Sequence, residues 1–307
     1  MAGFSLIKSR SASIKLARLE EAVVKKLLFL CAGFCVVVTA GIVFILVSET
    51  SAFFSDVSAW DFFTGTQWTP LFEPRSFGVL PLVSGTLMIA LGAGVIGIPT
   101  GLAVALFLND YAPDWLRSII KPVMEILAGV PTVVYGYFAV TSVTPLLRSM
   151  IPDVEVFNAA SACIVVGIMI LPMVASLCDD ALRAVPRALR EGGYALGATK
   201  FEVSSMVAIP AALSGIIASF ILAISRALGE TMAVTLAAGA TPKMSLDFFH
   251  SIQTLTSYIV QISMGDTPHG TVEYRSIFAV GMLLFVMTLF FNLLAYYLVR
   301  RFRSVYE

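Results

Sequence analysis

The chain has 307 residues, of which 58% are hydrophobic and only 13% charged, and its 20 basic and 20 acidic side chains leave a formal net charge of zero. Soluble domains usually carry about 25% charged residues, so this composition excludes a soluble enzyme and an intrinsically disordered chain. A zero net charge offers no positive field for nucleic acid. We therefore expect a lipid bilayer, and no nucleic acid, as a partner of this chain.

Six apolar runs are long enough to cross a bilayer, which takes ~20 residues in a helix. In chain order the runs are 27–47, 80–108, 119–147, 159–178, 211–239 and 277–299. The first run exceeds the apolar core of a signal peptide, which has about 7–15 residues, so we interpret it as a retained anchor; a cleaved signal is the alternative. The predicted fold class is an all-α integral membrane protein with six transmembrane helices.

Orientation follows from lysine and arginine, which concentrate in the cytoplasmic loops of membrane proteins. Most of the 20 basic residues fall on the cytoplasmic side if both termini lie inside the cell. The predicted organisation is a cytoplasmic N-terminal segment, 1–26, a first transmembrane helix, 27–47, an external loop, 48–79, a membrane core, 80–300, with a cytoplasmic loop at 179–210, and a cytoplasmic tail, 301–307.

Two features inside the runs are interpreted as structural. Gly97 and Gly101 have the small-xxx-small spacing that lets membrane helices pack closely. Glu125 lies near the cytoplasmic surface, where it is expected to snorkel or to pair with Lys121 or Arg117 without a substrate role.

A polar stretch interrupts the apolar pattern between the fourth and fifth runs. Residues 179–210 are too polar to lie in lipid. Their charged side chains include Arg183, Arg187, Arg190, Glu191, Lys200 and Glu202. Pro186 is placed to begin a helix, because proline is favoured at the first helical position. Gly192, Gly193 and Gly197 then open a smooth face on which another surface can pack.

The spacing in this stretch resembles a known motif. A glutamate and two glycines are followed after three residues by another glycine, and after nine more by an aliphatic run that ends in proline. This resembles the cytoplasmic loop E-A-A-x3-G-x9-I-x-L-P of bacterial ABC importer permeases, although the chain has Gly-Gly in place of Ala-Ala. In that family the loop forms a coupling helix that docks on the ATPase. The resemblance implies ATPase coupling through Glu191, Gly192, Gly193, Gly197 and Pro210; an unrelated polar loop is the alternative.

A second group of polar residues lies within the fifth run, where Arg226 and Glu230 flank a glycine, Gly229. A charged residue at the centre of a membrane helix costs about 2.5–3.5 kcal/mol on insertion scales, so these side chains must face protein or water. Four positions apart on a helix, they share one face and can neutralise each other as a structural ion pair.

The alternative interpretation is an anion path. The guanidinium of Arg226 can bind phosphate oxygens through two parallel hydrogen bonds. Glu230 could accept a hydrogen bond from a protonated phosphate oxygen, which fully ionised sulfate lacks. Gly229 is expected to loosen the helix, as in the interrupted helices of transporters.

Residues 226–234, together with 77–87 and 125–136, resemble the PstC-type permeases of phosphate-specific ABC importers, and the similarity extends over roughly residues 77–300. The sister PstA type shares the Arg-x-x-Gly-Glu core, but the Thr-Met-Ala-Val that follows favours the PstC type. The resemblance implies a type-1 ABC importer (MetI-like) bundle that translocates inorganic phosphate into the cytoplasm. The residues expected to line its path are Arg226, Gly229, Glu230 and Thr231.

The resemblance also implies partners: a PstA-like permease, a PstB-like ATPase dimer and a PstS-like phosphate-binding protein. ATP and Mg²⁺ would bind the ATPase, since the chain has no G-x-x-x-x-G-K-[ST] phosphate loop. The chain itself is expected to be non-catalytic, without cofactor or metal, and to lie in the cell inner membrane. Its four cysteines lie in or beside apolar runs and are interpreted as packing residues.

Two other functions stay open on the sequence. The permease could carry another oxyanion of the molybdate or sulfate type, or the chain could be an ion-gradient-driven anion carrier not coupled to an ATPase. The polar stretch 179–210 argues against the second, because such a carrier does not need a coupling loop. A membrane-embedded enzyme is disfavoured because the sequence has no catalytic motif such as H-E-x-x-H or G-x-S-x-G.

Overall fold

The computed structural model describes residues 2–302, and within them it leaves out the side chains of residues 2–20, 22 and 302. Most of the predicted segment 1–26 is therefore described by its backbone alone, and residues 303–307 of the predicted tail 301–307 lie outside the described residues. The described chain is helical apart from its loops and one short hairpin, which confirms the predicted all-α class.

The first part of the chain contains α1 (Ala2–Asp56), α2 (Ala59–Thr64), β1 (Trp68–Thr69), β2 (Ser76–Phe77), α3 (Leu80–Leu106), η1 (Phe107–Tyr111), α4 (Asp114–Gly129), α5 (Thr132–Phe138), η2 (Ala139–Val143) and α6 (Thr144–Met150). The second part contains α7 (Ala159–Arg183), α8 (Arg187–Ala195), α9 (Lys200–Glu202), η3 (Val203–Ala208), α10 (Ile209–Ala211), α11 (Leu213–Leu228), α12 (Met232–Ala238), α13 (Leu255–Ser263) and α14 (Val272–Phe302). The η elements are π-helical turns, and β1 pairs with β2 in antiparallel register.

Four continuous helical segments are long and apolar enough to cross a membrane: Val23–Asp56, Leu80–Tyr111, Ala159–Arg183 and Val272–Arg301. Two further segments qualify only as bent pairs. One joins Asp114–Gly129 to Thr132–Met150 at 90°, and the other joins Lys200–Ala211 to Leu213–Leu228 at 74°. The predicted six spans are reached when each bent pair counts as one span.

The first bend has a local cause in the sequence. Helix α4 ends at Gly129, and Val130 and Pro131 adopt extended backbone before α5 begins at Thr132. A proline disfavours helical backbone in the residue before it, so the chain turns at this point. The predicted third run, 119–147, is therefore two helices rather than one.

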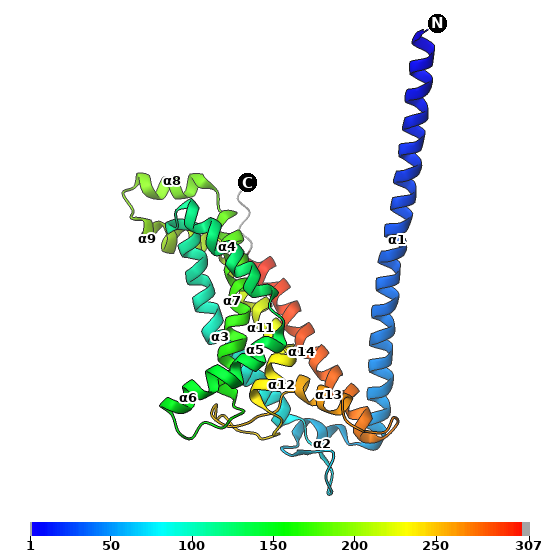
Figure 1. The fold of residues 1–307 in the computed structure, drawn as a ribbon, viewed down its shortest axis with the longest axis vertical. Helices are drawn as coiled ribbons and strands as arrows, with labels where there is room; N and C mark the ends of the chain where they lie inside the picture. The colour runs from blue at the N-terminus through cyan, green and yellow to red at the C-terminus, as the bar shows by residue number, and fades with distance from the viewer. Residues whose placement is uncertain (1, 303–307) are drawn as a thin grey trace.

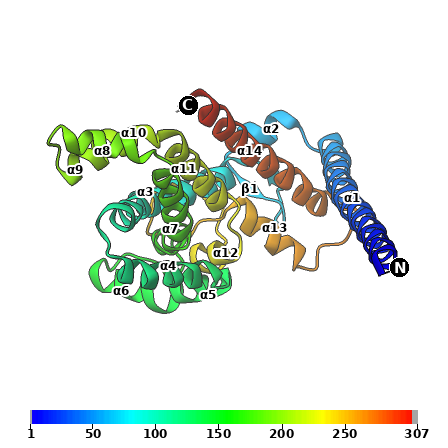
Figure 2. The same cartoon turned by 90° about the horizontal axis from the view of Figure 1, so that it is seen from above.

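Helices α3 and α7 form the core of the bundle and pack very closely against each other (Figure 2). A Cβ added at Gly97 would lie 2.6 Å from Cγ1 of Ile170, and one added at Gly101 would lie 2.7 Å from Cβ of Val174. The predicted close packing through these two glycines is thus confirmed.

The molecule has two distinct ends (Figure 1). The start of α1, the end of α14 and α8 lie toward one end, which we call the α8 end. The hairpin, α2 and α13 lie toward the opposite end, which we call the α2 end. There the aromatic rings of Phe53, Phe62, Trp68 and Tyr258 pack together edge to face and join α1 and α2 to α13.

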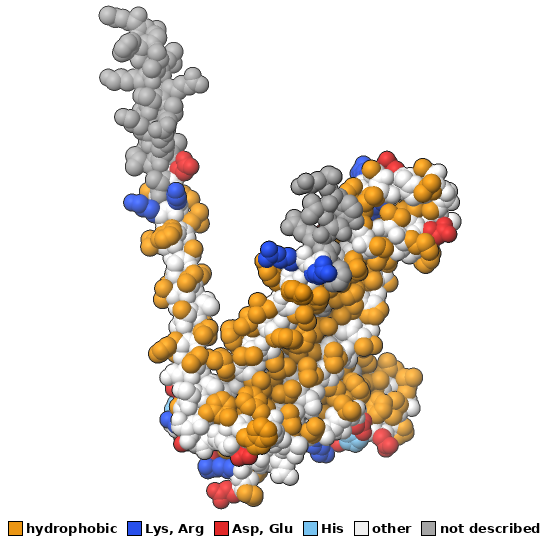
Figure 3. Space-filling view, turned by 180° about the vertical axis from the view of Figure 1, so that it is seen from behind, with side chains coloured by type: hydrophobic (Ala, Val, Ile, Leu, Met, Phe, Trp, Pro, Cys, Tyr) orange, Lys and Arg blue, Asp and Glu red, His pale blue; other side chains and the backbone are white. Residues whose placement is uncertain are grey.

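Hydrophobic side chains cover the middle of the bundle, and the charged side chains gather at its two ends (Figure 3). This distribution fits a bilayer-embedded body with water at both ends. Helix α1 packs on α14 and stands at the edge of the molecule, away from the α3–α7 core (Figure 2).

Candidate functional site

The predicted coupling loop forms a helix that lies outside the bundle at the α8 end (Figure 1). As predicted, Pro186 stands directly before the first turn of this helix, α8. Glu191 and Gly192 are exposed, and a Cβ added at Gly192 would meet no atom. Gly193 packs on the next segment, where an added Cβ would lie 3.0 Å from Cγ2 of Val203.

Two further residues of the predicted motif set the geometry of the loop. Gly197 has φ +84°, a left-handed conformation that glycine adopts without strain, and it reverses the chain after α8. Pro210 lies in α10, next to the bend that leads into α11. Large apolar side chains on the loop, Tyr194, Leu196, Phe201 and Met206, are exposed.

A polar contact that the sequence analysis missed holds α8 against the bundle. Arg190 donates one hydrogen bond to the Asp110 carboxylate in η1, and a second one, of 2.9 Å, to the carbonyl of Leu182. The hydroxyl of Ser204 in η3 donates to the other oxygen of Asp110. Asp110 is thus the node through which both arms of the loop are tied to the end of α3.

The sequence analysis missed a second such node, the buried carboxylate of Asp179. The side chain of Asp179 in α7 is 1% exposed and contacts three cations. Arg117 Nη2 is 2.9 Å from Oδ1, while Lys121 Nζ and Arg183 Nε are 3.2 and 3.1 Å from Oδ2. The sequence signal for part of this node was an acidic residue at the end of an apolar run with a base, Arg183, four positions on. Arg117 and Lys121 come from α4 and gave no local signal.

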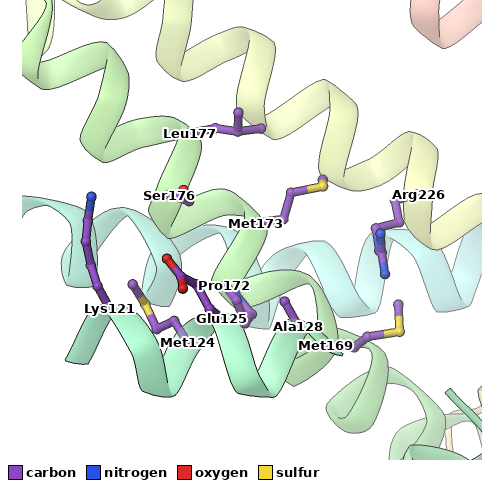
Figure 4. Close-up of a pocket in the computed structure, with 10 residues that line it drawn as sticks. All are labelled: Lys121, Met124, Glu125, Ala128, Met169, Pro172, Met173, Ser176, Leu177 and Arg226. Atoms are coloured by element: carbon purple, nitrogen blue, oxygen red, sulfur yellow. The ribbon is translucent and has the colours of Figure 1, made fainter. Parts of the chain in front are cut away.

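The predicted pairing of Glu125 with Arg117 or Lys121 is wrong, because both bases contact Asp179 instead. Glu125 lines a cavity of about 330 Å³ between α4, α7 and α11 (Figure 4). Arg226 of α11 and Ser176 of α7 line the same cavity.

The shared helical face predicted for Arg226 and Glu230 is also wrong. Helix α11 ends at Leu228, Gly229 follows as its cap, and α12 starts only at Met232. The fifth run, 211–239, is therefore not one helix. Among the described residues no ion pair joins Arg226 to Glu230, so the structural ion pair is not formed either.

The two charges of this pair have different surroundings. Arg226 is exposed toward the cavity, whereas Glu230 is buried and its Oε1 accepts a hydrogen bond of 3.1 Å from the backbone N–H of Ala233. The carbonyl of Glu230 accepts a hydrogen bond of 2.8 Å from the Thr256 hydroxyl, and Thr231 bonds back to the carbonyl of Gly229. Glu230 thereby fixes the break, and the loosening expected at Gly229 is found as a full interruption of the helix.

The arrangement can attract an anion. Arg226 and Lys121 supply positive charge to the cavity lining. Arg117 and Arg183 contact the same Asp179 carboxylate as Lys121 and add positive charge nearby. Cations exceed carboxylates around this space, so its potential favours anions over cations. Within the described residues no group of acidic, histidine and cysteine side chains is arranged to hold a metal ion.

Comparison with known proteins gives a family match for residues 97–304, to the family described as binding-protein-dependent transport system inner membrane component. The probable ABC transporter permease protein YqgH of Bacillus subtilis is 35% identical over 245 residues, which are 80% of this chain and 79% of that protein. The phosphate transport system permease protein PstC of Xylella fastidiosa is 31% identical over 284 residues, covering 83% of this chain and 86% of that protein.

Solved structures share the fold. An inward-facing structure of the MetNI methionine ABC transporter aligns with a TM-score of 0.61 at 20% identity and covers 76% of this chain and all of that one. An amino acid ABC transporter crystal structure aligns with a TM-score of 0.51 at 20% identity over 72% of this chain and 94% of that one. These similarities support the MetI-like bundle predicted from the sequence.

Proposed function

The chain belongs to the family of binding-protein-dependent transport system inner membrane components, and from this premise we propose that it is the permease subunit of an ATP-driven importer of inorganic phosphate. The identity of the substrate is inferred from the similarity to a PstC protein over more than four-fifths of both chains. An anionic substrate also needs positive charge along its path, and the cavity lined by Lys121 and Arg226 supplies it.

In this proposal Arg226 offers a transient attraction to phosphate from the wall of the cavity between α4, α7 and α11. Weak attraction suits a path, because tight binding would slow release. Gly229 and Thr231 form the interruption that ends α11 two residues after Arg226, and Glu230 holds that interruption in place. These four residues therefore act together along the path.

The energy would come from a separate PstB-like ATPase dimer that binds ATP and Mg²⁺ and docks on α8. Exposed apolar side chains of the loop, Leu196 and Phe201 among them, supply surface for that contact. A PstA-like permease would complete the membrane part, and a PstS-like phosphate-binding protein would deliver phosphate at the α2 end. The α8 end, with the start of α1 and the end of α14, would then face the cytoplasm of a cell whose inner membrane holds the complex.

Uptake of labelled phosphate tests the proposal. A strain lacking its own phosphate importer would receive the chain with its partner subunits, and uptake should appear only when the ATPase can hydrolyse ATP. Uptake that follows molybdate or sulfate but not phosphate would assign the chain to another oxyanion. Uptake that collapses under an uncoupler while ATP stays high would instead support an ion-gradient-driven carrier.

A further inference from the structure

Glu125 and Arg226 face the same cavity from different helices, α4 and α11 (Figure 4). Both residues are exposed, and among the described residues neither takes part in an ion pair. The carboxylate is therefore available to a ligand that Arg226 attracts. The nearest base on α4, Lys121, also lines the cavity, but its ammonium is held 3.2 Å from Asp179.

Both charges lie in helices that form bent membrane-span candidates, α4 in the first pair and α11 in the second. Charged side chains at membrane depth face water or protein rather than hydrocarbon, because burial of an unpaired charge in lipid is costly. The open face of this cavity must therefore be a hydrated path or a surface covered by a partner. A hydrated path keeps Glu125 within reach of a passing solute, whereas a covering partner would remove it from the path.

A carboxylate beside an anion path has a specific chemical consequence. An ionised carboxylate only accepts hydrogen bonds, so it repels an anion whose oxygens are all acceptors. Inorganic phosphate keeps at least one proton near neutral pH and can donate it to the carboxylate in a charge-assisted hydrogen bond. Sulfate is fully ionised and has no such donor.

We propose that Glu125 is a specificity-determining residue of the permease itself, which admits protonated phosphate to the cavity of Arg226 and disfavours sulfate. This inference rests on the proposed function and moves the discriminating role away from Glu230. The carboxylate of Glu230 is buried and is engaged by the backbone of α12, whereas that of Glu125 is exposed on the cavity wall.

The test measures anion binding to the assembled complex of both permeases and the ATPase in detergent, without the binding protein, so that no upstream selectivity intervenes. Thermal unfolding is followed during titration with sodium phosphate or sodium sulfate, with chloride used to keep the ionic strength constant. Binding to the folded state raises the unfolding temperature with ligand concentration. Sulfate also stabilises proteins without binding them, and the Arg226→Gln complex measures that background.

The wild-type complex should bind phosphate about tenfold more tightly than sulfate, the size expected for one hydrogen bond to a charged group. Glu125→Gln should bring this ratio close to one, mainly by improving sulfate binding, because an amide can donate as well as accept. Glu125→Asp keeps the charge but withdraws it by one methylene, and should give an intermediate ratio. The control Asp114→Asn removes an exposed carboxylate from the same helix but outside the cavity, and should leave the ratio unchanged.

A wild-type ratio in the Glu125→Gln complex would overturn the inference, as would a wild-type complex that does not distinguish the two anions. If in either case the wild-type complex still took up labelled phosphate in proteoliposomes, the proposed function would stand and only the role of Glu125 would fall. A wild-type complex that neither transports phosphate nor gains stability from it would contradict the proposed function itself.

Discussion

Arg190 on α8 donates a hydrogen bond to Asp110 in η1, the π-helical turn that follows α3, although the two residues are 80 positions apart in the sequence. The side chains are 18% and 5% exposed, so the pair is shielded from water and from screening by salt. It connects the helix proposed to meet the ATPase with the helix that forms the centre of the bundle. Side chains thus link α8 to η1 and α3, which the backbone does not join directly. In the proposed function, a movement of α8 would reach α3 through this contact.

Removing the charge of Asp110 should therefore uncouple hydrolysis from transport. In reconstituted complexes Asp110→Asn is expected to keep ATP hydrolysis but to lower the amount of phosphate moved per ATP. The physical reason is that α8 loses its firmest side-chain contact with the bundle. The measurement is the ratio of labelled phosphate uptake to ATP hydrolysed in proteoliposomes.

Arg187→Gln is the matched control, because Arg187 is an exposed arginine on the same helix and has no side-chain hydrogen bond among the described residues. Equal transport per ATP in Asp110→Asn and Arg187→Gln would show that the contact does not transmit force.

Asp179→Asn should destabilise the bundle at its α8 end. The substitution leaves Arg117, Lys121 and Arg183 around a neutral side chain. Because these three side chains are 24–42% exposed and stay in contact with water, the cost is expected to be smaller than the roughly 3–5 kcal/mol of a fully buried pair. A lower unfolding temperature of the purified complex would be the sign. Asp180→Asn, at the exposed neighbouring position, is expected to unfold like wild type; equal unfolding of both variants would argue against this node.

Gly97→Ala should loosen the α3–α7 contact. Its Cβ would lie 2.6 Å from Ile170 Cγ1 and 2.7 Å from the backbone oxygen of Gly167, so the helices would have to separate, at a cost of about 1–3 kcal/mol. Gly41→Ala in α1 meets no atom and should instead be neutral or slightly stabilising. Unfolding of the two purified variants in parallel measures the difference, and a stabilised Gly97→Ala would contradict the packing described above.

Substitutions at Gly197 should weaken docking of the ATPase in a defined order. Its φ of +84° is strained for residues with a Cβ by about 1–2 kcal/mol, and asparagine tolerates this region better than alanine. The amount of ATPase that co-purifies should therefore fall from wild type to Gly197→Asn and further to Gly197→Ala. An added Cβ would meet no neighbouring atom of this chain, so the expected cause is backbone strain and not a clash within the loop. Equal recovery in all three would mean that the turn does not position α8 for docking.

Arg226→Gln should reduce phosphate uptake strongly, whereas Arg226→Lys should retain part of it. Lysine keeps the positive charge at the cavity but loses the planar pair of donors that matches phosphate oxygens. Initial rates of labelled phosphate uptake measure the order of the three proteins. Full activity in Arg226→Gln would remove Arg226 from the path.

The sequence also predicted several local features correctly, because each depends on neighbouring residues. Pro186 marks the start of α8, and Gly97 and Gly101 mark a close helix contact. The sequence was less reliable where an apolar run contains a break. Hydropathy does not change at Pro131, yet the chain turns there. At Gly229 the sequence indicated a loosened helix, but not that α11 ends at Leu228 and that α12 begins only at Met232.

Hydropathy, charge bias and loop spacing by themselves determined the class of this protein, its apolar runs and the place of the polar loop 179–210, because lipid requires apolar helices of a given length wherever they pack. Only the tertiary structure decided which charges meet. Asp110 pairs with Arg190, Asp179 gathers three cations, and Glu125 rather than Glu230 faces the cavity of Arg226. Such pairs join residues on separate helices, and their partners are set by how the bundle packs, which no local pattern contains.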